Sequence, residues 1–509
     1  MPDSVREGTG YDAARATGYD ARRHVVHTRA DGLLASTTAE DVRAIARAAA
    51  AADRVVIHFH GGLVSSDRGF ATAERLTAEY QRAGAYPVFF VWSSGLLETV
   101  TGNLREILAE DLCKQLLRWL LRFAVGKLGQ TGAQRAVGEI TLPYEMEVNA
   151  ELRTRDDGRE PYAGTAPRGD VAPVDDTERE QLELAVAEDA DLAAQLEAVL
   201  AGLHPERVVT GARGVPVERR TSERTLMSPD VLAAIDPGPA AGQRGIVSTA
   251  LLAKKLAAVF TDVVRRFRAG TDHGVYPTVV EELLREFYLA NVGAAIWSAM
   301  KKDTLDTFAS GNEPHGGALF LDEFGAALGG HRPELTLVGH STGAVFIDNF
   351  LSALGTSRVP ADFAVRNVVL LAPACTFGHL AEGLVRHADR VGQLRLFTMA
   401  DVAERADHLV PGLYPRSLLY LVAGLLERDA AGGSSYQLVA GLQRYYADRY
   451  DDLDGVRAVR GYAGDRLVLS PTAPDAAAGL RAAALSHGAF DEDGEVLASI
   501  RAIIAGGNG

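Results

Sequence analysis

Short apolar, β-branched runs alternate with amphipathic helical stretches in this chain, and that alternation constrains its fold most strongly. Residues 54–60 (RVVIHFH) and 86–92 (YPVFFVW) predict two buried strands, with a helix over 69–83 between them. Strand, helix and strand in succession form the unit of parallel sheets, because a parallel connection needs a long crossover. The sequence therefore predicts an α/β fold with a mostly parallel sheet flanked by helices.

The same alternation returns in the C-terminal part of the chain. Helices over 317–328 and 344–354 alternate with strands over 334–338, 365–371 and 393–399. The two parts of the sheet are separated by far more residues than a connection normally contains, so the intervening stretch must carry structure of its own.

These patterns divide the chain into four parts. Residues 1–35 lack periodicity and are expected to form a flexible arm, whereas 36–95 and 316–509 supply the sheet. A helix over 39–52 opens the core, with a capping box expected at Thr37 and Glu40. Residues 96–315 are expected to form a mainly helical insertion, with a mobile acidic and polar segment near 151–245. Long amphipathic patterns within the insertion cover 104–128, 246–267 and 279–300.

Charge and cysteine usage exclude several classes of protein. The formal net charge of −15 opposes a nucleic-acid partner, because phosphate binding needs an excess of Lys and Arg. The two cysteines, Cys113 and Cys375, indicate neither a disulfide framework nor a metal site. No apolar run reaches the roughly 18 residues of a membrane span, and the polar N-terminus lacks a secretory signal, so a cytoplasmic location is expected.

The most informative short motif is Gly339-His340-Ser341-Thr342-Gly343, which fits the G-x-S-x-G pattern. The pattern gains weight from its setting, since a predicted strand precedes it directly and a predicted helix follows it. In such a sharp turn the serine takes up strained backbone angles, and small neighbours let the strand and helix approach closely. Ser341 is therefore the candidate nucleophile.

LTLVGHSTGAVFIDNFL, together with VVIHFHGGL upstream, resembles the α/β-hydrolase superfamily, particularly its lipase and esterase branches. The resemblance covers about residues 54–95 and 315–509. The long insertion lies ahead of the nucleophile, which differs from the commoner position of a lid in that superfamily. The resemblance implies an α/β-hydrolase fold, with the insertion as a cap, and a catalytic triad in the order Ser, acid, His.

That order directs the search for the acid and the base. Asp401 is the first carboxylate after the strand over 393–399 and is the expected acid, with Glu404 and Asp407 as alternatives. Of the histidines after Asp401, His408 follows too soon to come from the next strand, which leaves His487 as the expected base.

The resemblance also implies two backbone N–H groups that stabilise an oxyanion. Thr342 supplies one, as the residue after the nucleophile, and Gly62 supplies the other, with Leu63 as the alternative. His60 is expected to brace this loop and not to transfer protons.

The function expected from these residues is hydrolysis of a carboxylic ester or related acyl bond through an acyl-enzyme, without a cofactor or a metal. The expected partner is a small-molecule or lipid acyl substrate, and no nucleic acid. Two alternatives stay open: a phospholipase-type effector with peripheral membrane contact, and a non-catalytic binding protein on the same fold. The oligomeric state and the acyl substrate stay undetermined.

Overall fold

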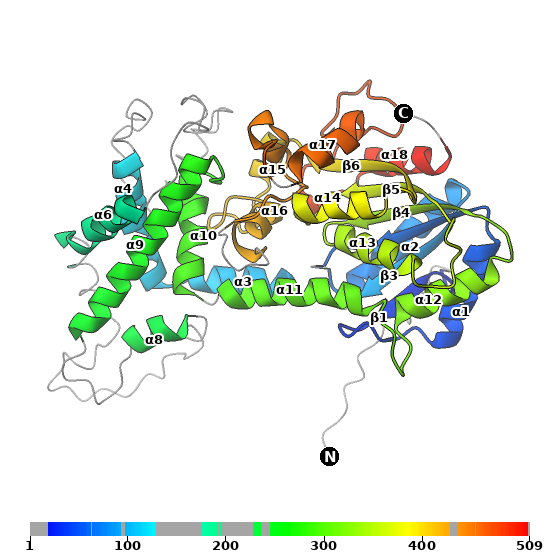
Figure 1. The fold of residues 1–509 in the computed structure, drawn as a ribbon, viewed down its shortest axis with the longest axis horizontal. Helices are drawn as coiled ribbons and strands as arrows, with labels where there is room; N and C mark the ends of the chain where they lie inside the picture. The colour runs from blue at the N-terminus through cyan, green and yellow to red at the C-terminus, as the bar shows by residue number, and fades with distance from the viewer. Residues whose placement is uncertain are drawn as a thin grey trace, which may run out of the picture. The chain divides into compact units, whose positions relative to one another are not determined.

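The computed structural model describes residues 19–62, 64–92, 97–128, 176–190, 194, 227–235, 245–288, 290–427, 436–453 and 455–506 (Figure 1). The chain forms two compact units. The first, here called the sheet unit, consists of Met1–Thr99, Ile296–Asp407 and Leu438–Gly509. The second, the helical unit, consists of Val100–Ala295 and His408–Gln437.

The sheet unit contains a seven-stranded sheet in the order β1-β3-β2-β4-β5-β6-β7, and all neighbouring strands pair in parallel. The strands are β1 (Val25–Thr28), β2 (Arg54–Phe59), β3 (Tyr86–Trp92), β4 (Glu334–His340), β5 (Val365–Leu371), β6 (Val391–Met399) and β7 (Leu467–Ser470). This confirms the predicted parallel sheet of an α/β protein.

Strand β2 lies in the interior of the sheet, between β3 and β4. Ile57 of β2 is in register with Val88 on one side and Leu337 on the other, and all three are fully buried. Central strands are apolar along their whole length because helices cover both faces of the sheet. This explains why the strand sequences show continuous apolar runs and no alternation.

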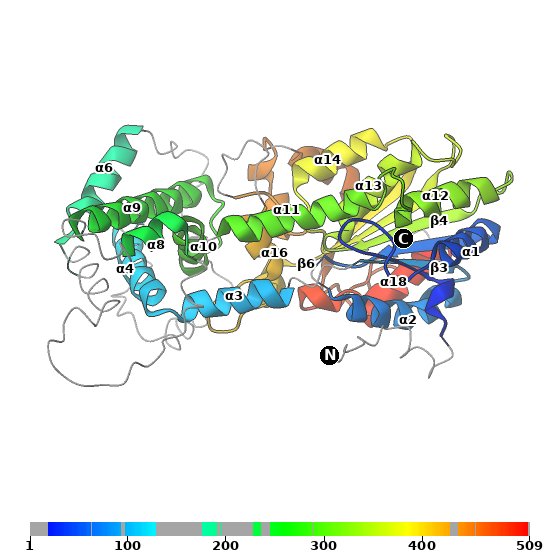
Figure 2. The same ribbon diagram turned by 90° about the horizontal axis from the view of Figure 1, so that it is seen from below.

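Two layers of helices cover the sheet. Figure 2 shows α12, α13 and α14 on one face and α2 and α18 on the other. The helices of this unit include α1 (Ala39–Ala51), α2 (Ser66–Arg82), α12 (Gly316–Ala327), α13 (Gly343–Leu354), α14 (Phe377–Arg386), α15 (Asp401–Ala406), α17 (Val456–Ala463) and α18 (Gly494–Ile504).

The expected flexible arm is wrong for residues 19–35. Val25–Thr28 forms the edge strand β1, which is buried along its length and pairs with β3. The Thr37 hydroxyl accepts a hydrogen bond from the His27 N–H and donates one to the Val25 carbonyl. Thr37 therefore fastens β1, and the capping box of α1 is made by Thr38 and Asp41, one residue later than expected.

The helical unit contains more helices than its periodicity predicted. The pattern over 104–128 is divided between α3 (Leu97–Ala109) and α4 (Asp111–Leu128), and that over 279–300 between α10 (Val275–Phe287) and α11 (Ala290–Asp306). Other helices among the described residues of this unit include α6 (Asp176–Ala187), α8 (Pro229–Ile235), α9 (Gly245–Ala269) and α16 (Leu418–Leu421). Helices α3 and α11 each contain residues of both units.

A buried ionic network holds the helical unit together. Arg266 of α9 forms ion pairs with Glu281 and Glu282 of α10, at 2.6 and 2.8 Å, and all three side chains are almost fully buried. Glu281 also accepts hydrogen bonds from the His273 ring and from the Tyr414 hydroxyl. Although burial alone would raise the pKa of Glu281, His273 and Arg266 lower it to about 2. Tyr414 belongs to the 408–437 segment, so this network ties that segment to α9 and α10.

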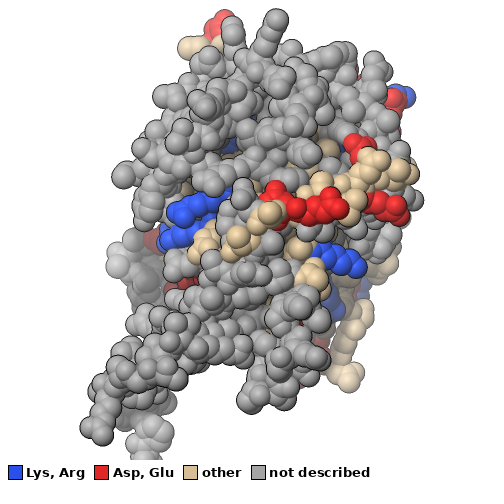
Figure 3. Space-filling model, turned by 90° about the vertical axis from the view of Figure 1, so that its left-hand side faces the viewer, with Lys and Arg blue, Asp and Glu red and all other residues tan. Residues whose placement is uncertain are grey.

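The apolar face of α4 is buried within the helical unit. Leu112, Leu116, Trp119 and Leu120 are each less than 5% exposed, so these side chains do not form a surface that could dock on a membrane. On the face of the molecule drawn in Figure 3, described side chains of both signs are interspersed. Among the described residues, no helix has the length and apolar character needed to cross a membrane.

Candidate active site

Ser341 occupies the sharp turn between β4 and α13. Its φ angle is +56°, and among the described residues Ala372 is the only other non-glycine residue with a positive φ. The Ser341 N–H donates to the Leu371 carbonyl at 2.8 Å, and the Ser341 carbonyl accepts from the Ala374 N–H at 3.0 Å. The left-handed conformation costs a side-chain-bearing residue about 1–2 kcal/mol, so the hydrogen bonds to the end of β5 must hold it in place.

The glycines that flank Ser341 let β4, α13 and β2 approach closely. A Cβ atom on Gly343 would lie 2.4 Å from the Phe59 carbonyl oxygen, and one on Gly339 would lie 2.7 Å from the Gly343 carbonyl oxygen. No side chain fits at such distances without moving the backbone. The sequence pattern around Ser341 is therefore required by the packing of the strand-turn-helix.

A two-glycine loop after β2 lies against the turn. A Cβ on Gly61 would be 3.2 Å from the Ser341 Cβ, and one on Gly62 would be 2.8 Å from the Thr342 Oγ1. The loop and the turn come from strands that are neighbours in the sheet, and both follow the carboxyl ends of those strands. This edge of a parallel sheet is where ligands bind in α/β proteins.

The backbone N–H groups of Gly62 and Thr342 have no acceptor among the described residues. Both residues are buried, and Thr342 is fully inaccessible. Because buried backbone donors are almost always paired, two neighbouring unpaired N–H groups beside a serine are suited to donate hydrogen bonds to a ligand oxygen. Leu63, the alternative donor, lies outside the described residues.

His60 braces the glycine loop. Its Nδ1–H donates to the Gly61 carbonyl at 2.8 Å, and its Nε2 accepts from the Trp92 N–H at 3.1 Å. The imidazole also stacks on the Trp92 ring. Burial lowers the pKa of His60 to about 4, so the ring is neutral and fixed in one tautomer.

His487 lies in a short 3-10 turn after β7 and is only 7% exposed. Its ring centroid is 5.1 Å from that of His340, the residue directly before Ser341. Neither ring nitrogen has a hydrogen-bond partner among the described residues, so no bond joins His487 to Ser341 in this structure. Burial and the charge of His340 lower the pKa of His487 to about 3, which leaves the imidazole neutral.

His340 connects the serine turn to the His487 turn. Its Nδ1 is 2.9 Å from Oδ2 of Asp491, and its Nε2 is 2.9 Å from the His487 carbonyl oxygen. Both partners can only accept hydrogen bonds, so both ring nitrogens must carry hydrogen. Burial would lower the pKa of His340, but the Asp491 carboxylate and the His487 carbonyl raise it above its ordinary value.

The buried charge of Asp491 is shared with a second histidine. His58 of β2 places its Nε2 3.7 Å from Oδ1 of Asp491, and its Nδ1 forms a 2.8 Å hydrogen bond with the Tyr80 hydroxyl. Burial lowers the pKa of His58 to about 4. Burial would raise the pKa of Asp491, but His340, His58 and Arg75 together hold it below its ordinary value. Asp491 is therefore an anion that anchors His340.

The three candidate acids occupy different places around α15. Asp401 pairs with Arg405 at 3.2 Å, and its backbone N–H donates to Gln443. Glu404 is fully buried. Asp407, which ends α15, accepts a 2.7 Å hydrogen bond from the backbone N–H of His487. The structure thus brings Asp407 into contact with the backbone of His487, whereas Asp401 contacts Arg405 and Gln443.

Sequence reasoning missed the pairing of His340 with Asp491. His340 was one of the variable positions of the motif, and Asp491 was one of several acidic residues in the run Asp491-Glu492-Asp493. A histidine buried at the end of a central strand needs a polar partner. This requirement was the only feature of the sequence that indicated a partner for His340. Among the described residues, no cluster of His, Cys, Asp and Glu side chains is arranged to hold a metal ion.

Comparisons with protein-family models, curated proteins and solved structures find no match to this chain.

Proposed function

We propose that this protein is a serine hydrolase with an α/β-hydrolase fold that cleaves a carboxylic ester or related acyl bond. The observation that carries the proposal is the left-handed Ser341 beside two buried, unpaired N–H groups, those of Gly62 and Thr342. A strained serine costs stability, and unpaired buried donors cost more. Both costs are understood if the site stabilises a tetrahedral oxyanion.

In the proposed mechanism the Ser341 Oγ attacks the acyl carbon while His487 takes up the hydroxyl proton. The carbonyl oxygen becomes an oxyanion and accepts hydrogen bonds from Gly62 and Thr342, each worth roughly 3 kcal/mol to the transition state. The bond to the leaving alcohol then breaks, and the proton passes from His487 to that alcohol. Water repeats the sequence on the acyl-enzyme and releases the carboxylic acid.

Asp407 replaces Asp401 as the acid in this proposal. The acid of a triad orients the imidazole and stabilises its protonated form during the reaction. Asp407 already contacts the backbone of His487, whereas Asp401 pairs with Arg405. A rotation of the His487 ring would let the same carboxylate accept from its Nδ1–H.

We further propose that the helical unit is the cap of the hydrolase and selects the acyl group. Its two segments begin at Val100, soon after β3, and at His408, directly after Asp407. Both departures follow the carboxyl ends of strands, the edge that carries Ser341. A small-molecule or lipid acyl substrate is consistent with this organisation.

The proposal is tested by turnover of p-nitrophenyl esters of increasing acyl length. Ser341→Ala and His487→Ala should each reduce kcat by at least about 10³-fold. Ser357→Ala is the control, because its hydroxyl contacts only the backbone after α13, donating to the Leu354 carbonyl and accepting from the Val359 N–H. Equal turnover by the wild-type protein and Ser341→Ala would overturn the proposal, and no turnover of any ester by the wild type would favour a binding protein.

The acyl-length series also separates esterase from lipid-directed activity. Higher kcat/KM for long-chain esters, together with stimulation by anionic phospholipid vesicles, would indicate a lipid substrate at a membrane surface. A preference for short acyl groups, with no effect of vesicles, would indicate a small-molecule esterase.

A further inference from the structure

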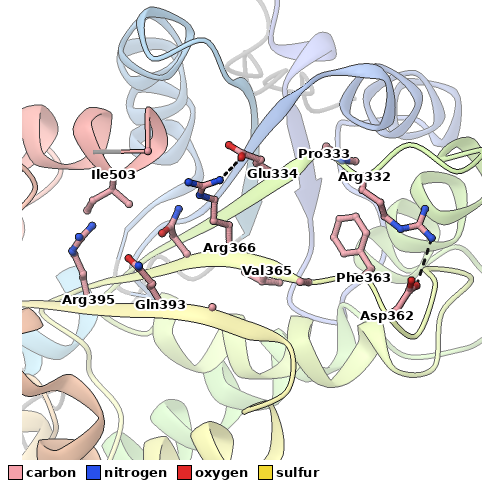
Figure 4. A pocket seen from close by; sticks show the side chains of 14 residues that line it. Arg332, Pro333, Glu334, Asp362, Phe363, Val365, Arg366, Gln393, Arg395 and Ile503 are labelled. Carbon is pink, nitrogen blue, oxygen red and sulfur yellow. Dashed lines mark hydrogen bonds and ion pairs between the residues drawn. The ribbon is translucent and has the colours of Figure 1, made fainter. Parts of the chain in front are cut away.

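A pocket of about 550 Å³ lies at the amino edge of the sheet, opposite the edge that carries Ser341. It is formed where β4, β5 and β6 begin, and the C-terminal end of α18 contributes Ile503 and Gly506 (Figure 4). Its apolar wall includes Phe363 and Val365. The pocket lies entirely within the sheet unit.

Three arginines and two carboxylates line this pocket. Arg366 pairs with Glu334, and Arg332 pairs with Asp362 at 3.5 Å. Figure 4 draws both pairs, and it shows Arg395 apart from them, pointing toward Ile503. The lining therefore contains one cation more than it contains anions, and that cation is Arg395.

Arg395 is buried without a partner. The residue is only 4% exposed, its Nε atom is inaccessible and unpaired, and its guanidinium forms no hydrogen bond or ion pair among the described residues. Burial and the neighbouring charge of Arg466 lower the pKa of Arg395, and Asp465 opposes this effect. Buried charges in proteins are normally paired, so this position needs an explanation.

The end of α18 gives a partial structural explanation. The last carbonyl groups of a helix carry partial negative charge and favour a nearby cation. No carbonyl of α18 accepts a hydrogen bond from Arg395, however, so the two terminal nitrogens of its guanidinium remain available to a ligand, although its Nε atom is inaccessible. The pocket beside it has the space that a ligand would require.

We propose that this pocket binds a small organic anion, whose carboxylate or phosphate group pairs with Arg395 and whose apolar part packs on Phe363, Val365 and Ile503. The planar guanidinium matches these oxyanions with two parallel hydrogen bonds. One unmatched cation favours an anionic ligand, and the volume exceeds what an inorganic anion would fill. The inference does not rest on the hydrolase proposal, because the two sites lie at opposite edges of the sheet.

Thermal unfolding of the full chain with four probes tests the proposal. Benzoate and phenyl phosphate carry the anion on an apolar body, benzamide is the neutral isostere of benzoate, and inorganic phosphate is the anion alone. Benzoate or phenyl phosphate at high excess should raise Tm by about 2–5 °C, with a smaller rise for inorganic phosphate and none for benzamide. Ser341→Ala should give the same shifts, which separates this pocket from the candidate active site.

The variant Arg395→Met distinguishes a ligand site from a structural cation. If Arg395 binds a ligand, removing its unpaired charge should leave the ligand-free protein equally or more stable. The same substitution should abolish the increases in Tm with benzoate and phenyl phosphate. Arg444→Met is the matched control, because Arg444 is similarly buried at 8% exposure but does not line the pocket, and it should retain the shifts. A loss of stability in Arg395→Met, with no shift in the wild type, would show a structural cation and overturn the proposal.

Discussion

The backbone N–H of His487 donates a 2.7 Å hydrogen bond to Oδ2 of Asp407. This bond joins the end of α15 to the turn after β7, two segments that are far apart in the sequence. It fixes the position of the His487 backbone at the carboxyl edge of the sheet. In the proposed mechanism, rotations of the two side chains would let the Asp407 carboxylate accept a hydrogen bond from the Nδ1–H of His487.

Replacing Asp407 with Asn should reduce kcat by about 10³- to 10⁴-fold while the fold is retained. The Asn side-chain oxygen can still accept from the His487 N–H, so the loss reports the missing charge and not the missing anchor. Asp401→Asn is the matched variant, and it should change kcat less than about threefold. The assignment of the acid fails if Asp401→Asn gives the large loss and Asp407→Asn does not.

Replacing His340 with Gln should weaken the connection between Ser341 and the His487 turn. Gln can donate to only one of the two acceptors, Asp491 or the His487 carbonyl, so the turn loses an anchor. We expect kcat to fall by about 10- to 100-fold with KM nearly unchanged, because positioning affects the transition state most. A change in KM alone would argue against this positioning role.

The buried histidines should also make stability depend on pH, with opposite signs. The pKa of His340 is raised, so its contribution to stability is fully present below the unfolded value of 6.5 and is lost as pH rises through its folded pKa. The pKa values of His58 and His60 are lowered to about 4, so their contribution is present above 6.5 and is lost as pH falls toward 4.

Urea unfolding between pH 4 and pH 9 measures both effects. The wild type should lose stability below about pH 6.5, because the histidines with lowered pKa outnumber His340. The difference in unfolding free energy between the wild type and His340→Gln should be largest below about pH 6 and should shrink as pH rises. A difference that is constant across this range would contradict the doubly protonated His340.

Gly62→Ala should impair both activity and stability. The new Cβ would lie 2.8 Å from the Thr342 Oγ1 and 3.1 Å from the Trp92 ring, so the loop would move away from the turn. We expect a stability loss of about 1–3 kcal/mol and a larger proportional loss in kcat. Gly461→Ala in α17 is the control, since its Cβ meets nothing within 4 Å, and it should be neutral or stabilising by up to about 1 kcal/mol.

The parts of the fold that sequence predicted are those with long, continuous patterns. Strands β3 and β5 begin and end at the predicted residues, because buried parallel strands are apolar throughout. Strand β1 was missed, since its four residues, including His27 and Thr28, are too few and too polar to show a period. The single helix predicted over 104–128 is two helices that meet at Glu110, and an amphipathic pattern continues through such a break.

The residues of the candidate site also fall into those that the sequence predicted and those that it did not. Ser341, Gly62 and Thr342 follow from local backbone requirements, which leave glycines and a fixed spacing in the sequence. The choice between Asp401 and Asp407 depends on where α15 directs each carboxylate, and the pairing of His340 with Asp491 depends on how the turn after β7 returns to β4. Contacts between distant segments leave no spacing rule, so only the three-dimensional arrangement gives them.

The central claim is that Ser341 is the activated nucleophile, and labelling with a fluorophosphonate followed by mapping of the modified peptide tests it most directly. The wild type should be labelled at a single peptide that contains Ser341, and Ser341→Ala should not be labelled although it unfolds at the same temperature. His487→Ala should slow labelling by at least about 100-fold. Labelling of the wild type at another residue, or none at all by the folded protein, would contradict the account.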